Sequence, residues 1–241
     1  MAAGNDKAGT ARKARKPGAP AKKRARKRAP GRPAGDSPNM RPRLLDAAVA
    51  CFARRGIGAT SLRAIAVESG VTPAMLHYYF GDMPQLLQAV IDERLLPATA
   101  MLRAWLEAAG EDVAALVAAF VGGIGEVIAR HPWLPSLWVR EVLCEGGALR
   151  EVMLQRIAPQ IPRLLAARFA AAQQCGALNP GLDPRLLMVS LVGLTLFPAA
   201  SAPIWRRIFD ADAAAGGAHP IDAETMRRHT LALLEAGIGT G

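Results

Sequence analysis

Aromatic residues are scarce in this chain of 241 residues, at 5% of the total. Because 51% of the residues are hydrophobic all the same, alanine, leucine and valine must fill most of the core. The chain has only two tyrosines, and both stand in the segment VTPAMLHYYF, as Tyr78 and Tyr79. Tyrosine combines an apolar ring with a polar tip, so this short segment raises the question of what surface it contacts.

Cysteine and histidine are too few and too scattered to predict a metal centre. The three cysteines, Cys51, Cys144 and Cys175, are odd in number, far apart and without a CxxC pair, so we expect buried, reduced thiols. The four histidines are also dispersed, and there is no phosphate-binding loop, nucleophile elbow or HExxH motif. These absences predict a protein that is not an enzyme and that uses no cofactor and no metal.

No hydrophobic run is long enough to predict a membrane-spanning helix. The most apolar run, residues 186–200, has 15 residues, whereas a spanning helix needs roughly 20. We expect a buried helix of a soluble protein there. The N-terminus is charged and lacks the apolar centre of a secretory signal. The sequence therefore predicts a cytoplasmic location, with no membrane as partner.

Lysine is absent from all but the N-terminal part of the chain. Residues 1–35 contain twelve Lys and Arg and one acidic residue, whereas the other 206 residues contain 18 Arg, 19 Asp and Glu, and no lysine. The net charge of +10 therefore belongs to the first segment. Residues 1–38 contain almost nothing that could be buried, so we expect a disordered basic tail.

The remainder of the chain has the hydrophobic periodicity of helices, which predicts an all-α fold. Leu44, Ala48 and Phe52 share one face of the first helix, and Gly56 is suited to end it. Further helices are expected after Ser61, after Thr72 and after Asp82, with Gln85 completing a capping box. The later helices are expected near 98–108, 111–130, 135–158 with a break at 146–147, 160–175, 184–200 and 222–238.

Two short helices joined by residues 70–72 form a helix-turn-helix pattern. In this motif the second helix lies in the major groove of DNA. With Met75, Leu76 and Phe80 directed inward, His77 and Tyr78 face outward. A phenol hydroxyl there suits a phosphate oxygen. Taken alone, the segment is also compatible with an ordinary helical corner whose tyrosines pack in part.

The stretch from residue 44 to residue 91 resembles the DNA-binding domain of the TetR/AcrR family of bacterial transcriptional regulators. The matching features are AAVACFARRG, ATSLRAIAVESGVT, LHYYF and the LL that follows. The resemblance implies an all-helical homodimer, with an N-terminal three-helix helix-turn-helix domain at 39–91 and a C-terminal helical effector-binding and dimerisation domain at 92–241.

The resemblance also implies which residues approach DNA. Thr60 and Arg63 stand at the start of the second helix, and Thr72 opens the recognition helix. The full expected set is Arg32, Arg41, Thr60, Arg63, Thr72, Pro73, Ala74, His77, Tyr78 and Tyr79. The chain departs from the family at Pro73 and Met83, where basic residues are common, and this removes positive charge from the DNA-facing side.

The basic tail is the expected source of the missing charge. Phosphate contacts by Lys and Arg supply much of the affinity for DNA. The triplet Gly31-Arg32-Pro33 is similar to the core of an AT-hook, which enters the minor groove, although Pro30 stands where arginine is usual. The alternative is a solubilising segment that is attracted to any polyanion.

By the same resemblance, helices around residues 131–169 enclose an apolar effector pocket. The expected lining is Met101, Trp105, Phe120, Trp138, Cys144 and Met153, with Arg140 or Glu141 as polar anchors. The alternative is that these apolar side chains are ordinary core and that Arg140 and Glu141 form a solvated pair.

Together these observations predict a ligand-responsive transcriptional regulator, acting as a repressor. The resemblance also implies that the last two long helices, 160–175 and 184–200, pair across a two-fold axis as a four-helix bundle. Such a dimer places the reading helices about 34 Å apart on double-stranded DNA, over a palindromic operator. A small apolar effector is expected to release the homodimer. The alternative is a nucleoid-associated protein whose tail coats DNA without sequence preference.

Overall fold

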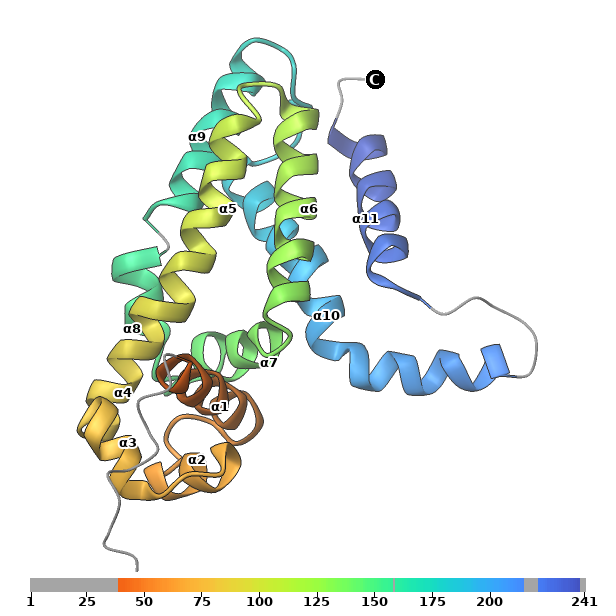
Figure 1. Cartoon of the computed structure of the whole chain (residues 1–241). Coiled ribbons are helices and arrows are strands. Elements are labelled where there is room, and N and C mark those ends of the chain that lie inside the picture. Colours follow the sequence, from red (N-terminus) through yellow and green to blue (C-terminus); the bar gives the residue numbers. More distant parts are fainter. Residues whose placement is uncertain (1–38, 158, 215–220, 239–241) are drawn as a thin grey trace, which may run out of the picture. The chain divides into compact units, whose positions relative to one another are not determined.

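A computed structural model describes residues 39–157, 159–214 and 221–238, the side chains of 210–214 excepted (Figure 1). Within these ranges all the regular secondary structure is helical, with no strand. The α-helices are α1 (Met40–Arg55), α2 (Leu62–Ser69), α3 (Pro73–Phe80), α4 (Met83–Val90), α5 (Leu96–Ala108), α6 (Val113–Arg130), α7 (Leu134–Trp138), α8 (Arg150–Val152), α9 (Ile161–Gln174), α10 (Pro184–Ala214) and α11 (Ala223–Ile238). Three π-helical turns interrupt them: η1 (Ile91–Leu95), η2 (Val139–Leu143) and η3 (Met153–Ile157).

Local capping sets the boundaries of the first four helices, as the sequence predicted. Gly56 ends α1 with φ 88°, and Gly70 ends α2 with φ 69°, both in the region that favours glycine. The Ser61 hydroxyl accepts a hydrogen bond from the Ala64 amide at the start of α2. Asp82 opens α4 with a complete capping box. The helix-turn-helix pattern is therefore confirmed as structure.

One hydrophobic cluster holds α1 to α4 together. Phe52 and Leu44 of α1 are fully buried in it, against Leu76 of α3. Leu137 of α7 and Leu149, which follows η2, belong to the same cluster. The helix-turn-helix part is thus packed directly on the region that follows α6. The domain boundary between residues 91 and 92 stays a prediction.

A second hydrophobic cluster unites α5, α6, α9, α10 and α11. Its largest buried side chains are Phe120 of α6 and Phe169 of α9. In Figure 1, α5, α6 and α9 run side by side, and α11 lies along α6. Aliphatic side chains supply most of the rest of this cluster, in keeping with the low aromatic content.

Helix α10 differs from the prediction in length and in burial. It has 31 residues and continues through Pro198 and Pro203, whereas the sequence indicated an end near residue 200. The Ser201 hydroxyl donates to the Phe197 carbonyl, and the Trp205 indole donates to the Pro198 carbonyl, so side chains satisfy backbone groups near the prolines. The expectation of a buried helix is confirmed for one face only, because Leu187 and Leu191 are buried in the second cluster, whereas Val189, Phe197 and other apolar side chains are exposed.

Two described helices, Val113–Arg130 and Pro184–Phe209, are long and apolar enough to cross a membrane by length and composition alone. The first is explained by its place in the second cluster, where eight of its residues are buried. The second is the exposed helix α10, whose apolar face is considered below.

The prediction of buried thiols is confirmed for one of the three cysteines and wrong for the other two. Cys51 is buried within α1, and burial raises the pKa of its thiol, so the thiol stays protonated. Cys144 and Cys175 are exposed, because each lies at the end of a helical segment and not on its inner face.

Candidate DNA-binding surface and ligand cavity

The recognition helix α3 presents a polar and small-residue face to solvent. Leu76 and Phe80 point into the first cluster, with exposed fractions of 0% and 6%. The exposed side chains on the opposite face are Thr72, Pro73, Ala74, His77 and Tyr78. Because the outward positions are small near the start of the helix, the backbone there can approach another molecule closely.

The two tyrosines of α3 have different surroundings. Tyr78 is 77% exposed, whereas Tyr79 is half-buried against the first cluster. Their rings meet edge to face, with centroids 5.3 Å apart, so the Tyr78 ring packs against the Tyr79 ring. The outward hydroxyl is therefore that of Tyr78.

His77 is held at the end of α3. Its Nδ1 lies 2.6 Å from the carbonyl oxygen of Gly81. Since a carbonyl only accepts, Nδ1 carries the proton and donates, which assigns the second ring nitrogen, Nε2, to any contact outside the helix.

Thr60 does not face solvent, contrary to the expectation of a phosphate contact. Its side chain is buried at 7% exposure, and its hydroxyl donates to the Gly56 carbonyl at 2.6 Å. The residue fixes the turn between α1 and α2. Arg63, on the first turn of α2, is exposed as expected.

Arg41 was also expected at the DNA, and the structure places it in a clamp within the protein. Its guanidinium pairs with Glu93, donates to the Tyr79 carbonyl at 3.0 Å, and lies over the Phe80 ring at 4.6 Å. Arg41 thus joins α1 to α3 and η1, and its charge is already paired.

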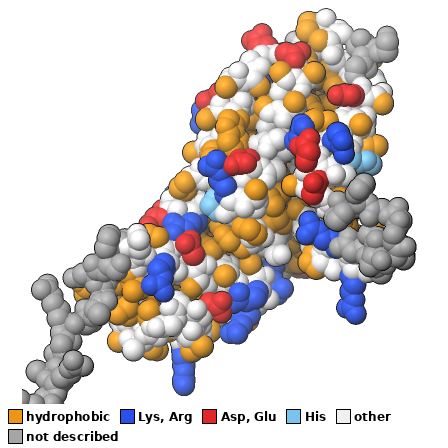
Figure 2. Space-filling model, turned by 45° about the vertical axis from the view of Figure 1, so that its right-hand side comes forward, with side chains coloured by type: hydrophobic (Ala, Val, Ile, Leu, Met, Phe, Trp, Pro, Cys, Tyr) orange, Lys and Arg blue, Asp and Glu red, His pale blue; other side chains and the backbone are white. Residues whose placement is uncertain are grey.

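Other arginines surround this end of the molecule and were not singled out from the sequence. Arg43 and Arg55 of α1 are exposed, and Arg54 pairs with Glu68 of α2 at 2.7 Å. Figure 2 shows side chains of the Lys and Arg colour projecting from the lower part of the molecule. Arg54 and Arg55 precede Gly56 in the sequence, and this pattern predicts only that a helix ends there. Arg32, in the basic tail, lies outside the described residues.

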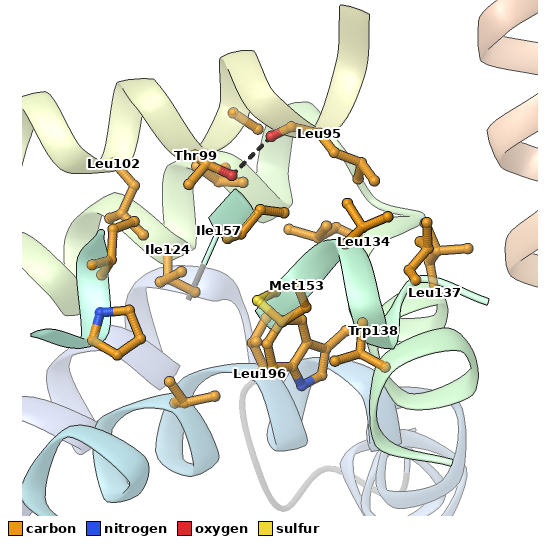
Figure 3. A pocket seen from close by; sticks show the side chains of 18 of the residues that line it. Leu95, Thr99, Leu102, Ile124, Leu134, Leu137, Trp138, Met153, Ile157 and Leu196 are labelled. Atoms are coloured by element: carbon orange, nitrogen blue, oxygen red, sulfur yellow. Dashed lines mark hydrogen bonds between the residues drawn. The ribbon is translucent and has the colours of Figure 1, made fainter. Parts of the chain in front are cut away.

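A cavity of about 130 Å³ lies between the two hydrophobic clusters (Figure 3). Side chains from all the α-helices from α5 to α10 and from all three π-helical turns line it. Its lining contains no charged residue, and Thr99 is the one hydroxyl-bearing side chain. The Thr99 hydroxyl donates to the Leu95 carbonyl at 2.9 Å, so even this group is already satisfied.

Three of the eight residues expected to line an effector pocket lie along this cavity: Phe120, Trp138 and Met153. Trp105 packs instead beside Gly123, and the Met101 sulfur accepts a hydrogen bond from Arg130. Arg140 and Cys144 are exposed. Periodicity places a residue on a face of its helix, but it does not say which two faces enclose an empty space.

Glu141 is neither a pocket anchor nor a solvated partner of Arg140. Its side chain is buried at 5% exposure and points away from the cavity, toward the turn after α1. The π-helical turns that carry much of the lining had no recognised signal in the sequence. Among the described residues, no group of three His, Cys, Asp or Glu side chains is arranged to hold a metal ion.

The fold and the exposed face of α3 define the class of the protein as a helix-turn-helix protein with a C-terminal helical domain. Residues 44–90 match the family model described as bacterial regulatory proteins of the tetR family. The HTH-type transcriptional regulator BetI of Brucella suis is 34% identical over 87 residues, which cover 35% of this chain and 44% of the relative. BetI of Rhizobium meliloti is 42% identical over 57 residues, which cover 24% of this chain and 28% of that one.

Residues 44–90 are therefore similar to the DNA-binding domain of TetR-family transcriptional regulators. The match spans less than half the length of these curated relatives.

Solved structures extend the likeness to the whole fold. The ketosteroid transcriptional regulator KstR2 of Mycobacterium tuberculosis has a TM-score of 0.63 at 22% identity, covering 87% of this chain and 100% of that one. SmeT, in complex with triclosan, has a TM-score of 0.56 at 21% identity, covering 83% and 92%. NalD, the secondary repressor of the MexAB-OprM multidrug efflux pump in Pseudomonas aeruginosa, has a TM-score of 0.56 at 22% identity. The alignment covers 85% of this chain and 98% of NalD. At these identities the likeness shows the fold alone.

Proposed function

We propose that this chain is a one-component repressor that binds a palindromic operator as a homodimer and leaves it when a small apolar effector binds. The observation that carries the proposal is α3, an eight-residue helix anchored by Leu76 and Phe80. It exposes His77 and Tyr78, and the exposed Thr72 directly precedes it. A helix held from behind, with polar groups in front, is suited to insertion into a major groove.

The apolar lining of the cavity favours an uncharged effector. Bringing a carboxylate or an ammonium group into a lining without a polar partner would cost several kcal/mol. The cavity volume of about 130 Å³ is comparable to that of an apolar cavity of about 150 Å³ that binds benzene, so a small aromatic or aliphatic molecule fits its size. SmeT with triclosan is an example of this fold in complex with a small, largely apolar molecule.

The exposed face of α10 supports the homodimer. Large apolar side chains recur along it at helical spacing: Leu186, Val189, Phe197, Ile204 and Ile208 are each more than half exposed. A continuous apolar stripe of this kind normally marks a contact surface. A second α10, related by a two-fold axis, presents the same stripe and covers it.

Footprinting tests the proposal directly. The purified protein is expected to protect a palindromic segment in the DNA that flanks its own gene. Saturating concentrations of neutral apolar compounds should remove that protection, whereas charged analogues of the same compounds should leave it. Protection that no apolar compound changes would contradict effector release, and the absence of any protected palindrome would contradict the operator.

The basic tail supports a second candidate, a DNA-coating protein without sequence preference. Residues 1–35 carry enough Lys and Arg to bind any duplex. The two candidates differ in specificity, because a regulator prefers its operator over random DNA by roughly 10³-fold or more. Competition with random duplex in the same binding assay measures this ratio.

A further inference from the structure

Glu141 is a buried carboxylate that joins two separate segments of backbone. One oxygen, Oε1, accepts a hydrogen bond from the Ile57 amide at 2.9 Å. The other, Oε2, accepts from the Ala148 amide at 3.1 Å. Within the described part of the chain no arginine or histidine forms an ion pair with it, so these two amides supply the stabilisation that a buried charge needs.

On one side, Glu141 holds the turn that starts α2. Gly56 is in tight contact with it, since a Cβ at Gly56 would lie 3.2 Å from Oε1. The Thr60 hydroxyl donates to the Gly56 carbonyl, and the Thr60 amide donates to the Ile57 carbonyl at 3.1 Å. Ser61, the cap of α2, follows directly. The position of Ile57 therefore sets where the helix-turn-helix motif begins.

On the other side, the same residue is built into the wall of the cavity. Trp138 and Val142 flank it on the segment that includes η2, and both line the cavity. The Glu141 carbonyl accepts from the amide of Leu149, a further lining residue, at 3.0 Å. A Cβ at Gly147 would lie only 2.3 Å from that carbonyl oxygen, so the backbones of the two segments are in close contact.

We propose that Glu141 is the positioning residue through which occupancy of the cavity changes the DNA-binding part of the chain, an inference that rests on the proposed function. A molecule in the cavity displaces Trp138, Val142 or Leu149. The carboxylate is held by two amides on different segments, so it cannot follow that displacement and keep both bonds. Loss of the Ile57 bond releases the turn before α2 and lowers the population of the conformation that fits DNA.

The decisive variant is Glu141→Gln, which keeps the size of the side chain. In glutamine an NH2 group replaces one of the two carboxylate oxygens, so either the Ile57 or the Ala148 amide faces a donor where it now has an acceptor. Glu145→Gln is the matched control, because Glu145 lies four residues further on, is exposed, and undergoes the same change of charge. Naphthalene, a neutral bicyclic hydrocarbon, serves as the probe for the cavity.

Amide hydrogen exchange by NMR, on the full-length protein, is the measurement. In the wild type, saturating naphthalene is expected to speed exchange of the Ile57 amide about tenfold, with Leu116 in the core of α6 unchanged. In Glu141→Gln, the amide that faces the NH2 group, Ile57 or Ala148, should already exchange fast, and Ile57 should not respond to naphthalene. Glu145→Gln should behave as the wild type. Operator affinity should fall about tenfold in Glu141→Gln and should no longer depend on naphthalene.

The outcomes separate this inference from the proposed function. If naphthalene leaves Ile57 unchanged in the wild type, or if Glu141→Gln keeps the wild-type response, the positioning role is wrong. Calorimetric titration with naphthalene then shows whether the cavity takes an apolar molecule at all. If the wild type protects no operator while exchange at Ile57 responds as expected, the proposed operator binding is wrong. The positioning role of Glu141 is then still supported.

Discussion

Tyr78 and Phe80 are two positions apart on α3 and have opposite environments. Tyr78 is 77% exposed and Phe80 is 6% exposed. We expect Tyr78→Ala to weaken operator binding about tenfold, which corresponds to about 1.4 kcal/mol, because it removes a groove-facing ring and hydroxyl. Its free energy of unfolding should stay within about 0.5 kcal/mol of the wild type. Gel-shift titration and urea denaturation measure the two quantities.

Phe80→Ala provides the contrast on the same helix. Removing this buried ring should destabilise the fold by about 3–5 kcal/mol, as for other large core aromatics. Tyr78→Phe then isolates the hydroxyl, since it keeps the ring. Equal operator affinity for Tyr78→Ala and the wild type would contradict the role given to α3.

His131 is expected to make stability depend on pH. Burial, together with the nearby charges of Arg94 and Arg130, lowers its pKa below the usual 6.5, while Asp46 opposes the shift. The folded state therefore binds a proton less readily than the unfolded state, and stability is lost as the pH falls through and below about 6.5. Urea denaturation at pH 7.5 and pH 5.5 should show the decrease.

Replacement of His131 by glutamine tests the source of that decrease. His131→Gln should make stability less dependent on pH in this range, although the absolute stability can change because the ring also contacts Trp133. His229→Gln is the control, because His229 is exposed on α11. An identical pH response in wild type and His131→Gln would assign the effect to other groups.

At the scale of the element, α6 contains adjacent glycines with different neighbours. A Cβ at Gly123 would lie 2.8 Å from the side chains of Leu102 and Trp105 of α5, whereas a Cβ at Gly122 would have nothing within 4 Å. Gly122→Ala should stabilise the protein by about 0.5–1 kcal/mol, because alanine favours the helix.

Gly123→Ala should destabilise it, since the Trp105 ring must move and overpacking typically costs about 1–3 kcal/mol. Chemical denaturation of both variants compares them on one helix. If both variants were stabilised, the contact between α5 and α6 would be looser than the structure indicates.

At the scale of the whole molecule, the apolar stripe of α10 is the proposed contact between two copies. Val189→Asp places a charge on a side chain that is 60% exposed in the single chain. Because a charge without a partner is costly in an apolar interface, we expect the variant to be monomeric and to lose operator protection. Sedimentation velocity measures the mass, and Ala104→Asp, on the exposed side of α5, should remain dimeric.

The basic tail is tested by its effect on salt dependence. Each phosphate contact contributes about 0.9 to the slope of log affinity against log salt. Removing residues 1–35 should therefore flatten the slope and weaken binding to operator and random DNA alike. An unchanged slope would show that the tail does not compensate for the charge missing at Pro73 and Met83.

Several features of this protein were determined by the sequence alone, because they depend on neighbours only a few residues away. Gly56 and Gly70 end helices through their own backbone conformation, and Asp82 with Gln85 caps α4 within one turn. The inward and outward faces of α3 follow from helical periodicity in the same way.

The tertiary structure decided the contacts between distant segments. Arg41 and Glu93 are 52 positions apart, and Ile57 and Glu141 are 84 apart. A hydrogen-bonding side chain carries no local signal of its partner, so the sequence indicated a DNA contact for Arg41 and a pocket anchor for Glu141. Packing of the two hydrophobic clusters brought these groups together, left the cavity between them, and left the apolar face of α10 uncovered.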